Sequence, residues 1–135
     1  MLRIRVSQAA AVLLVLLAGC APQPGPAPLA EAGRYLVYFN EFSAFTSDDA
    51  HKAIASAAAK AREIGAKAIR IEGRASATGS PVANQHLAET RTQVVYDELQ
   101  KDGVDPTIIQ QQPIGQTGSG DTGVTDRRVD IVLLK

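Results

Sequence analysis

One arginine stands where the sequence predicts an apolar side chain. Residues 81–102 are expected to form a helix, and at about 100° per residue Arg91 falls near the middle of its apolar arc. The arc consists of Ala83, Leu87, Val94, Val95 and Leu99. A guanidinium keeps its charge and is costly to bury alone, so it must meet a carboxylate, carbonyl oxygens, a bound anion or solvent. Two interpretations stay open: an internal ion pair with Glu72, Asp126 or Asp130, or a site for an anionic ligand.

A second set of polar groups lies in the segment IEGRASATGS, residues 71–80. It alternates like the end of a strand and then opens into a loop of glycine, serine, alanine and threonine. The loop supplies hydroxyls and main-chain amides but no acid. It can therefore hydrogen-bond a small ligand but cannot neutralise a positive charge on it.

The elements that must position these groups have the order β-α-β-α-β-β. In chain order, the expected strands and helices cover residues 34–39, 46–64, 66–73, 81–102, 105–112 and 127–134. Thr46 or Ser47 can cap the first helix, and Ser80 with Pro81 can begin the second. This order predicts an α+β two-layer sandwich, in which a small mixed sheet carries both helices on one face.

The N-terminal segment does not belong to that pattern. Residues 1–19 combine Arg3 and Arg5 with the apolar run AAAVLLVLLA, which is short for a permanent span and typical of an export signal. A buried or membrane-anchoring helix is the alternative. The sequence LAGC that follows resembles the lipobox of bacterial lipoproteins, which implies an acylated Cys20 and, with Ala21 after it, sorting to the outer membrane.

A spacer separates this signal from the folded domain. Residues 20–33 hold four prolines and favour an extended conformation of about 3.1 Å per residue, which could hold a domain up to roughly 40 Å from the lipid. Residues 34–135 then form one domain. Cys20 is the only cysteine, so the domain has no disulfide and no thiol nucleophile.

Charge and motif spacing argue against several other functions. The chain has 14 Lys+Arg and 14 Asp+Glu, which leaves no basic surplus for nucleic acid. His51 and His86 lack partners at metal-ligand spacing, and residues 115–123 are glycine-rich without the lysine of a phosphate loop. The serines lack a base. We therefore expect a binding protein rather than an enzyme, with no metal and no cofactor.

The residues around Arg91 also carry a resemblance to a known family. The stretch IEGRASATGSPVANQHLAETRTQVVYDELQKDGV and the late DRRVDI are similar to the OmpA-like peptidoglycan-binding domain, over about residues 35–134. The positions in register with the family pattern are Gly73, Gly79, Ser80, Asn84, Leu87, Arg91, Arg127, Arg128, Val129 and Ile131. The resemblance implies that Arg91 grips the carboxylate of diaminopimelate in the peptidoglycan stem peptide, with Asn84 and Arg127 beside it.

The ligand loop departs from the family at its acid. By resemblance an aspartate for the ligand's ammonium is expected where this chain has Ser76, and a histidine where it has Arg74. A charge-assisted hydrogen bond is about twice as strong as a neutral one, so Ser76 should weaken binding by about 1 to 3 kcal/mol. Arg74 should favour an anionic ligand over a zwitterion. As a conjecture, Asp126 supplies the missing negative charge from the opposite wall.

These features predict an outer-membrane lipoprotein whose domain faces the periplasm and binds peptidoglycan non-covalently, tethering envelope and wall. The alternative is a scaffold that kept the fold, lost the wall ligand and serves as an interaction subunit of an envelope assembly. The expected ligand-binding residues are Arg91, Ser76, Asn84, Arg74 and Arg127, and Cys20 is the expected lipidation site. The expected partners are peptidoglycan, the outer membrane and envelope proteins, but not nucleic acid.

Overall fold

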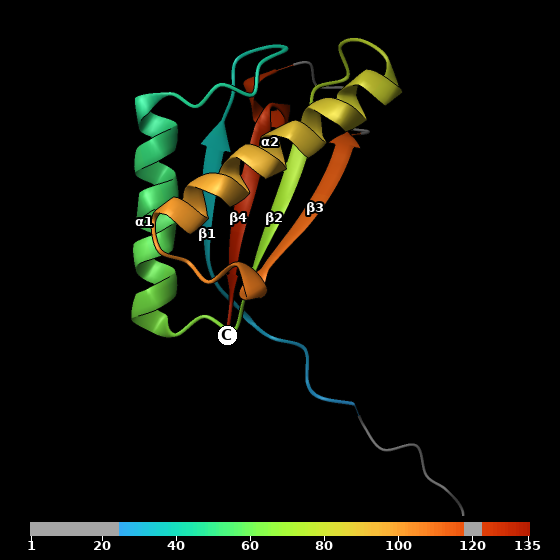
Figure 1. Ribbon diagram of the computed structural model, residues 1–135. Coiled ribbons are helices and arrows are strands. Elements are labelled where there is room, and N and C mark those ends of the chain that lie inside the picture. Colours follow the sequence, from blue (N-terminus) through green and yellow to red (C-terminus); the bar gives the residue numbers. More distant parts are fainter. Residues whose placement is uncertain (1–24, 118–122) are drawn as a thin grey trace, which may run out of the picture.

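The computed structural model describes residues 25–117 and 123–135, and it confirms the predicted element order (Figure 1). The elements are β1 (Glu31–Tyr38), α1 (Asp48–Ile64), β2 (Ala68–Ala75), α2 (Pro81–Lys101), β3 (Ile109–Gln116) and β4 (Arg128–Leu134), with short 3-10 helices η1 (Pro106–Ile108) and η2 (Val124–Asp126). The expected signal, Cys20 and residues 21–24 of the spacer lie outside the described residues, whereas residues 25–33 are described and the last three of them belong to β1. Within the described part, no helix is both long and apolar enough to span a bilayer.

The four strands form one mixed sheet in the order β1-β4-β2-β3. The last strand, β4, lies between the first two and runs antiparallel to both, so Ile131 is opposite Tyr35 on one side and Ile71 on the other. β2 and β3 are parallel, because α2 crosses over between them.

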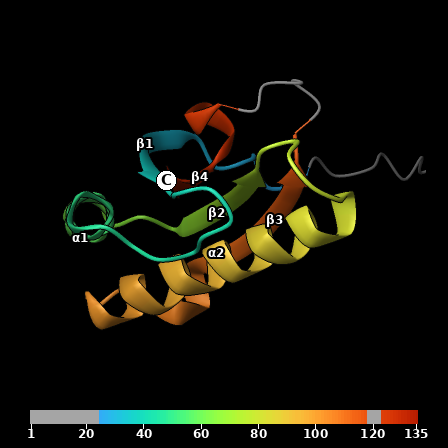
Figure 2. The same ribbon diagram turned by 90° about the horizontal axis from the view of Figure 1, so that it is seen from above.

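Both helices pack on one face of the sheet, which confirms the predicted two-layer α+β sandwich (Figure 2). The core between the layers is aliphatic, as the scarcity of aromatics requires. Its buried members include Ile54, Ala57, Ala58, Ala61, Ile69, Ile71, Val95, Leu99, Val129, Ile131 and Leu133.

The helix termini follow the predicted caps. The Ser47 hydroxyl accepts a hydrogen bond from Ala50 N at 3.2 Å, and the Ser80 hydroxyl accepts one from Ala83 N at 3.2 Å. Gly65 ends α1 in the left-handed conformation at φ 61°, which glycine adopts without steric cost.

Three strands have boundaries that differ from the prediction by more than one residue, and one of them is β2, which covers residues 68–75 instead of 66–73. β1 begins at Glu31, earlier than the expected Arg34. β3 covers residues 109–116 instead of 105–112. The cause at β3 is the side chain of Asp105, which accepts a hydrogen bond from Thr107 N at 2.8 Å and starts a 3-10 turn through Pro106.

Candidate functional site

Arg91 lies on the sheet-facing side of α2, and 0% of its surface is exposed. Its Nε donates to Ser43 O at 2.8 Å, its Nη1 to Arg74 O at 3.0 Å and its Nη2 to Asn40 O at 2.9 Å. The guanidinium carbon also lies 5.1 Å from the ring centroid of Phe39, within cation–π range. One side chain thus joins α2 to the end of β2 and to the turn that follows β1.

No carboxylate in the described part of the chain pairs with Arg91, which receives carbonyl oxygens instead. Glu72 and Asp130, two of the acids considered for an internal ion pair, are bonded to other arginines. Burial, with a smaller contribution from the positive charge of Arg127, lowers the pKa of Arg91 to about 10. The side chain therefore stays charged at neutral pH, with no buried counter-ion among the residues that the structure describes.

Gly73 explains how α2 comes close enough for this arrangement. A Cβ at this position would lie 2.5 Å from Thr92 Cγ2 and 2.7 Å from the carbonyl oxygen of Ala88. Only glycine fits without a shift of the helix, so the glycine of the motif sets the distance between β2 and α2.

Ser76 and Asn84 lie on the segments that Arg91 connects. Ser76 follows directly after β2, two residues beyond the carbonyl that Arg91 binds, and is 6% exposed. Asn84 lies in the first turns of α2, is 3% exposed, and donates from Nδ2 to Gln116 Oε1 at 3.4 Å. Both are buried polar residues at the same end of the sheet as Arg91.

A groove of about 290 Å³ opens beside these residues. It runs between the turn after β1 and the beginning of α2, and its lining residues are Phe42, Thr78, Gly79, Ala83, Asn84, His86, Leu87 and Thr90. The groove combines apolar walls with a few hydroxyl and amide groups, which is the usual character of a small-ligand site.

Phe42 is a groove residue that the sequence analysis did not single out. Its φ is 51°, a conformation that a bulky side chain rarely adopts, and it is 67% exposed. The bonds from Arg91 to Asn40 O and Ser43 O hold the two ends of the turn that presents it. The FNEF sequence at residues 39–42, which departs from the family's F-x-F-D, was the available signal.

The two remaining expected ligand residues are placed differently from each other. The Arg74 side chain lies on the face of the sheet away from the helices, where its Nη2 donates to Glu72 at 3.0 Å, so only its main chain reaches Arg91. Arg127 precedes β4, its carbonyl accepts from Phe39 N at 2.8 Å, and its charge acts on Arg91. Asp126 beside it is buried, and its conjectured role stays a prediction.

The histidines lie on the helix surfaces, where His51 pairs with Glu98 at 3.4 Å and His86 with Glu89 at 3.1 Å. Across residues 25–117 and 123–135, no group of three or more His, Cys, Asp or Glu side chains could hold a metal ion. Most of the glycine-rich stretch at 115–123 lies outside the described residues.

Similar proteins agree with this architecture. The OmpA-like domain of FopA1 from Francisella tularensis is 22% identical, covering 76% of this chain and 73% of that one, with a TM-score of 0.65. The peptidoglycan-associated lipoprotein of Burkholderia pseudomallei is 22% identical, covering 73% of this chain and 89% of that one, with a TM-score of 0.66. The periplasmic domain of Helicobacter pylori MotB (residues 78-256) is 20% identical, covering 73% and 70% of the two chains, with a TM-score of 0.61.

At these identities the solved structures establish the fold alone. No curated protein sequence matches the chain. The model of the OmpA family matches residues 38–129, which include β2, α2, β3 and the turn after β1. With most of its length matched by that model, the chain belongs to the OmpA family.

Proposed function

We propose that this protein is a lipid-anchored envelope protein whose OmpA-family domain binds peptidoglycan non-covalently, through the diaminopimelate of the stem peptide. Family membership supports this proposal, as does the fold shared with a peptidoglycan-associated lipoprotein and with periplasmic MotB domains. The LAGC sequence and the proline-rich residues after it support the lipid anchor. The domain then faces the periplasm and links outer membrane to wall.

The observation that carries the proposal is a buried positive charge that meets no acid among the described residues. Within that part of the chain Arg91 is bound by carbonyl oxygens and the Phe39 ring, and the charge of Arg127 acts on it. A carboxylate from outside the chain would complement Arg91, and the groove at Asn84 offers an approach. Each Nη of Arg91 carries a second N–H beyond the one already bonded.

Binding in this way requires the turn at residues 40–43 to move. It covers Arg91, which is 0% exposed, and its carbonyls occupy two of the donors. In the proposed complex the turn shifts, the ligand carboxylate reaches Arg91, and Ser76 and Asn84 contact the rest of the ligand. The strained φ of Phe42 favours a turn with more than one arrangement.

The same burial supports a second candidate function. A guanidinium satisfied by three main-chain carbonyls already has a structural role, and Ser76 stands where the family has its acid. A scaffold that keeps the fold and binds an envelope protein instead of the wall would have both features.

Co-sedimentation with purified sacculi separates the two functions. We expect wild type to pellet and Arg127→Ala and Asn84→Ala to bind at least about tenfold more weakly, with Arg70→Ala, on the other side of the sheet, as the matched control. These variants are preferred because Arg91→Ala disrupts the turn. If wild type and all variants stay soluble, the scaffold is the function.

Two further measurements test the finer parts of the proposal. Ser76→Asp should strengthen sacculus binding about tenfold if the missing acid limits affinity. Should Ser76→Asp have no effect while Asp126→Ala abolishes binding, the negative charge comes from Asp126. Mass spectrometry of the mature protein should show an acylated Cys20, and an unmodified N-terminus would contradict the anchor.

A further inference from the structure

We propose that the face of the sheet away from the helices is a second binding surface, which rests on an anionic phospholipid bilayer. We call it the open face, and we define it by the charged residues Glu31, Arg34, Arg70, Glu72, Arg74, Arg128 and Asp130. The proposal rests on the lipid anchor of the proposed function, and its test is independent of wall binding.

Strand alternation sets the open face apart from the core. Ile69, Ile71, Val129 and Ile131 point into the core between sheet and helices, so the residues that alternate with them point away. Both α1 and α2 lie on the other side of the sheet, and neither covers this one (Figure 2). A separate apolar cluster of Ala68, Val132 and Leu134 lies on this face, and these residues are 6%, 0% and 9% exposed.

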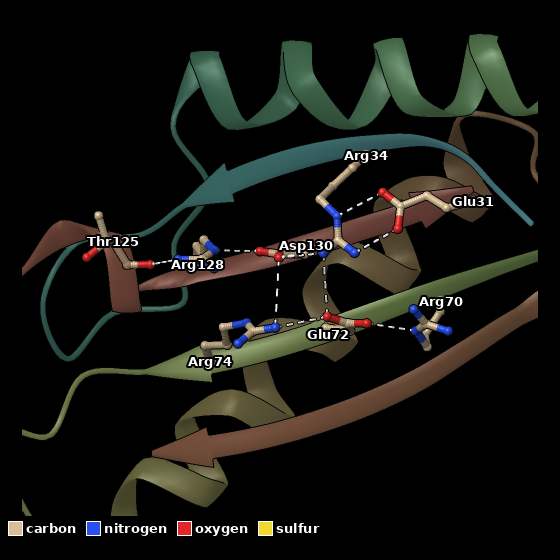
Figure 3. Close-up of polar contacts among 8 residues, drawn as sticks. All are labelled: Glu31, Arg34, Arg70, Glu72, Arg74, Thr125, Arg128 and Asp130. Carbon is tan, nitrogen blue, oxygen red and sulfur yellow. Dashed lines mark hydrogen bonds and ion pairs between the residues drawn. The ribbon is translucent and has the colours of Figure 1, made fainter. Parts of the chain in front are cut away.

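The charges at the centre of the open face are layered, with Glu72 and Asp130 inside and arginines around them (Figure 3). Glu72 and Asp130 are cross-strand neighbours, and their side chains are 11% and 3% exposed. Arg34 and Arg128 reach Asp130 at 2.8 and 2.7 Å. Arg70 and Arg74 reach Glu72 at 2.7 and 3.0 Å. The four arginine side chains are 23 to 35% exposed, and Glu31 at the margin is 44% exposed, so over Glu72 and Asp130 a partner meets guanidinium groups before carboxylates.

The guanidinium groups keep donors for a partner. Arg70 uses its Nε and Arg74 its Nη2 on Glu72, and Arg74 Nη2 also lies 3.9 Å from Asp130. No other hydrogen bond of these two side chains is present within the described residues. The residues that define this face are four arginines and three acids, which leaves one positive charge in excess among them. Arginine forks match phosphate oxygens in pairs, which favours a phosphate-bearing surface.

The margins of the open face suit a flat lipid surface. On β1, Leu36 and Tyr38 alternate with the core residue Val37 and are 39% and 44% exposed. On β3, Gln110 and Gln112 lie beside Arg70 and Glu72 in register and carry no charge. Tyrosine and leucine beside arginine are the residues that enter a membrane interface.

The point where the tether enters the domain favours a membrane over a soluble polymer. The first residue of β1 is Glu31, whose carboxylate accepts two hydrogen bonds from Arg34 at 3.0 and 2.9 Å. The segment that leads to the proposed anchor thus joins the domain at the open face. A short tether holds the domain at an effective concentration near the millimolar range, so a weak contact suffices. Each arginine near an anionic leaflet increases the affinity for the membrane about fivefold.

A single tryptophan can report this contact, because the chain has none of its own. The mature full chain is purified from cells and mixed with vesicles that contain brominated lipids, either with about one third anionic lipid or with zwitterionic lipid alone. Gln112→Trp places the reporter on the open face. Val82→Trp, on the exposed beginning of α2, is the matched control on the helix side.

We expect quenching of Gln112→Trp to be at least about twofold stronger with anionic lipid, and quenching of Val82→Trp to be unchanged. Adding Arg70→Gln with Arg74→Gln should remove the difference, and salt should weaken it. Because those changes leave Glu72 without its partners, Glu31→Gln is the second variant. It removes an exposed negative charge and should increase the quenching of Gln112→Trp.

Several outcomes would overturn the proposal. One is equal quenching of the two reporters. Another is quenching of Gln112→Trp that does not depend on the charge of the lipid. The third is a chain that binds neither kind of vesicle in a flotation assay. Arginine variants that lower sacculus pelleting but not quenching would assign the open face to a wall polymer instead. Sacculus binding by wild type would still stand in the first three cases.

Discussion

Buried charge is handled in opposite ways on the two sides of the sheet. On the helix side the cation is inside: Arg91 is 0% exposed and is bound by three carbonyl oxygens. On the open face two acids, Glu72 and Asp130, are inside and are covered by arginines. The first arrangement leaves a net positive charge that a carboxylate ligand can complete. The second neutralises its acids internally and offers only outward donors.

Burial has a different effect on the pKa of the charged group on each side of the sheet. Carbonyl dipoles satisfy the hydrogen bonds of a guanidinium but do not cancel its charge, so burial lowers the pKa of Arg91. On the open face, burial raises the pKa of Glu72, but hydrogen bonds from Arg70 and Arg74 outweigh it and the pKa falls below its ordinary value. Positive charge is thus stored at the candidate site, whereas on the open face acids balance all but one of the arginine charges.

The largest effect should come from Arg91→Ala. Three carbonyls lose their donor and a cavity opens under the turn, so we expect the free energy of unfolding to fall by about 3 to 5 kcal/mol in urea denaturation. Arg91→Lys should retain part of the lost stability, because the lysine can keep one of the hydrogen bonds to the carbonyls. A loss below about 1 kcal/mol would mean that the carbonyls find other donors.

Asp130→Ala should lower the free energy of unfolding by less, about 1 to 3 kcal/mol, because the arginines that lose their partner are partly solvated. Asp130 is itself 2% exposed, so the effect should exceed that of Asp97→Ala on the outer side of α2. Urea denaturation of both variants provides the measurement. If they behave alike, the layered charges on the open face contribute nothing to stability.

The stability contributions of Glu72 on the open face and Arg91 on the helix side should respond differently to acid. The lowered pKa of Glu72 means that it stabilises the fold above its ordinary pKa of 4.5, and that this contribution disappears as pH falls through the folded value. The stability difference between wild type and Glu72→Gln should therefore shrink below about pH 4.5. The penalty of Arg91→Ala should stay constant over the same range, since Arg91 does not titrate there. Stability curves from pH 3 to 7 would show either pattern.

Phe42→Gly should have the smallest effect on stability. Glycine accepts φ 51° without strain but loses backbone entropy, so we expect a change within about 1 kcal/mol in either direction. Sacculus binding should nevertheless drop several-fold, because Phe42 forms one wall of the groove. Unchanged binding would show that the ligand does not use the groove.

Local patterns in the sequence predicted most of the fold. The element order and the caps at Ser47 and Ser80 depend on short-range features, and the structure confirms them. Strand alternation is also a short-range feature, and from the core residues Ile69 and Ile71 it places Arg70, Glu72 and Arg74 on the open face. The family pattern suggested a place near the ligand loop for Arg74 instead. The 3-10 turn at 106–108 was not predicted, although the side chain of Asp105 that caps it is a local feature.

The sequence by itself determined that a charged residue would lie on the buried side of α2, since the helical period fixes which way position 91 points. Only the tertiary structure decided what meets it. The three carbonyls come from residues 17, 48 and 51 positions away, and no local pattern records which main chain arrives there. The positive φ of Phe42 also depends on the tertiary structure, because the turn that contains Phe42 packs over Arg91 and bonds to it.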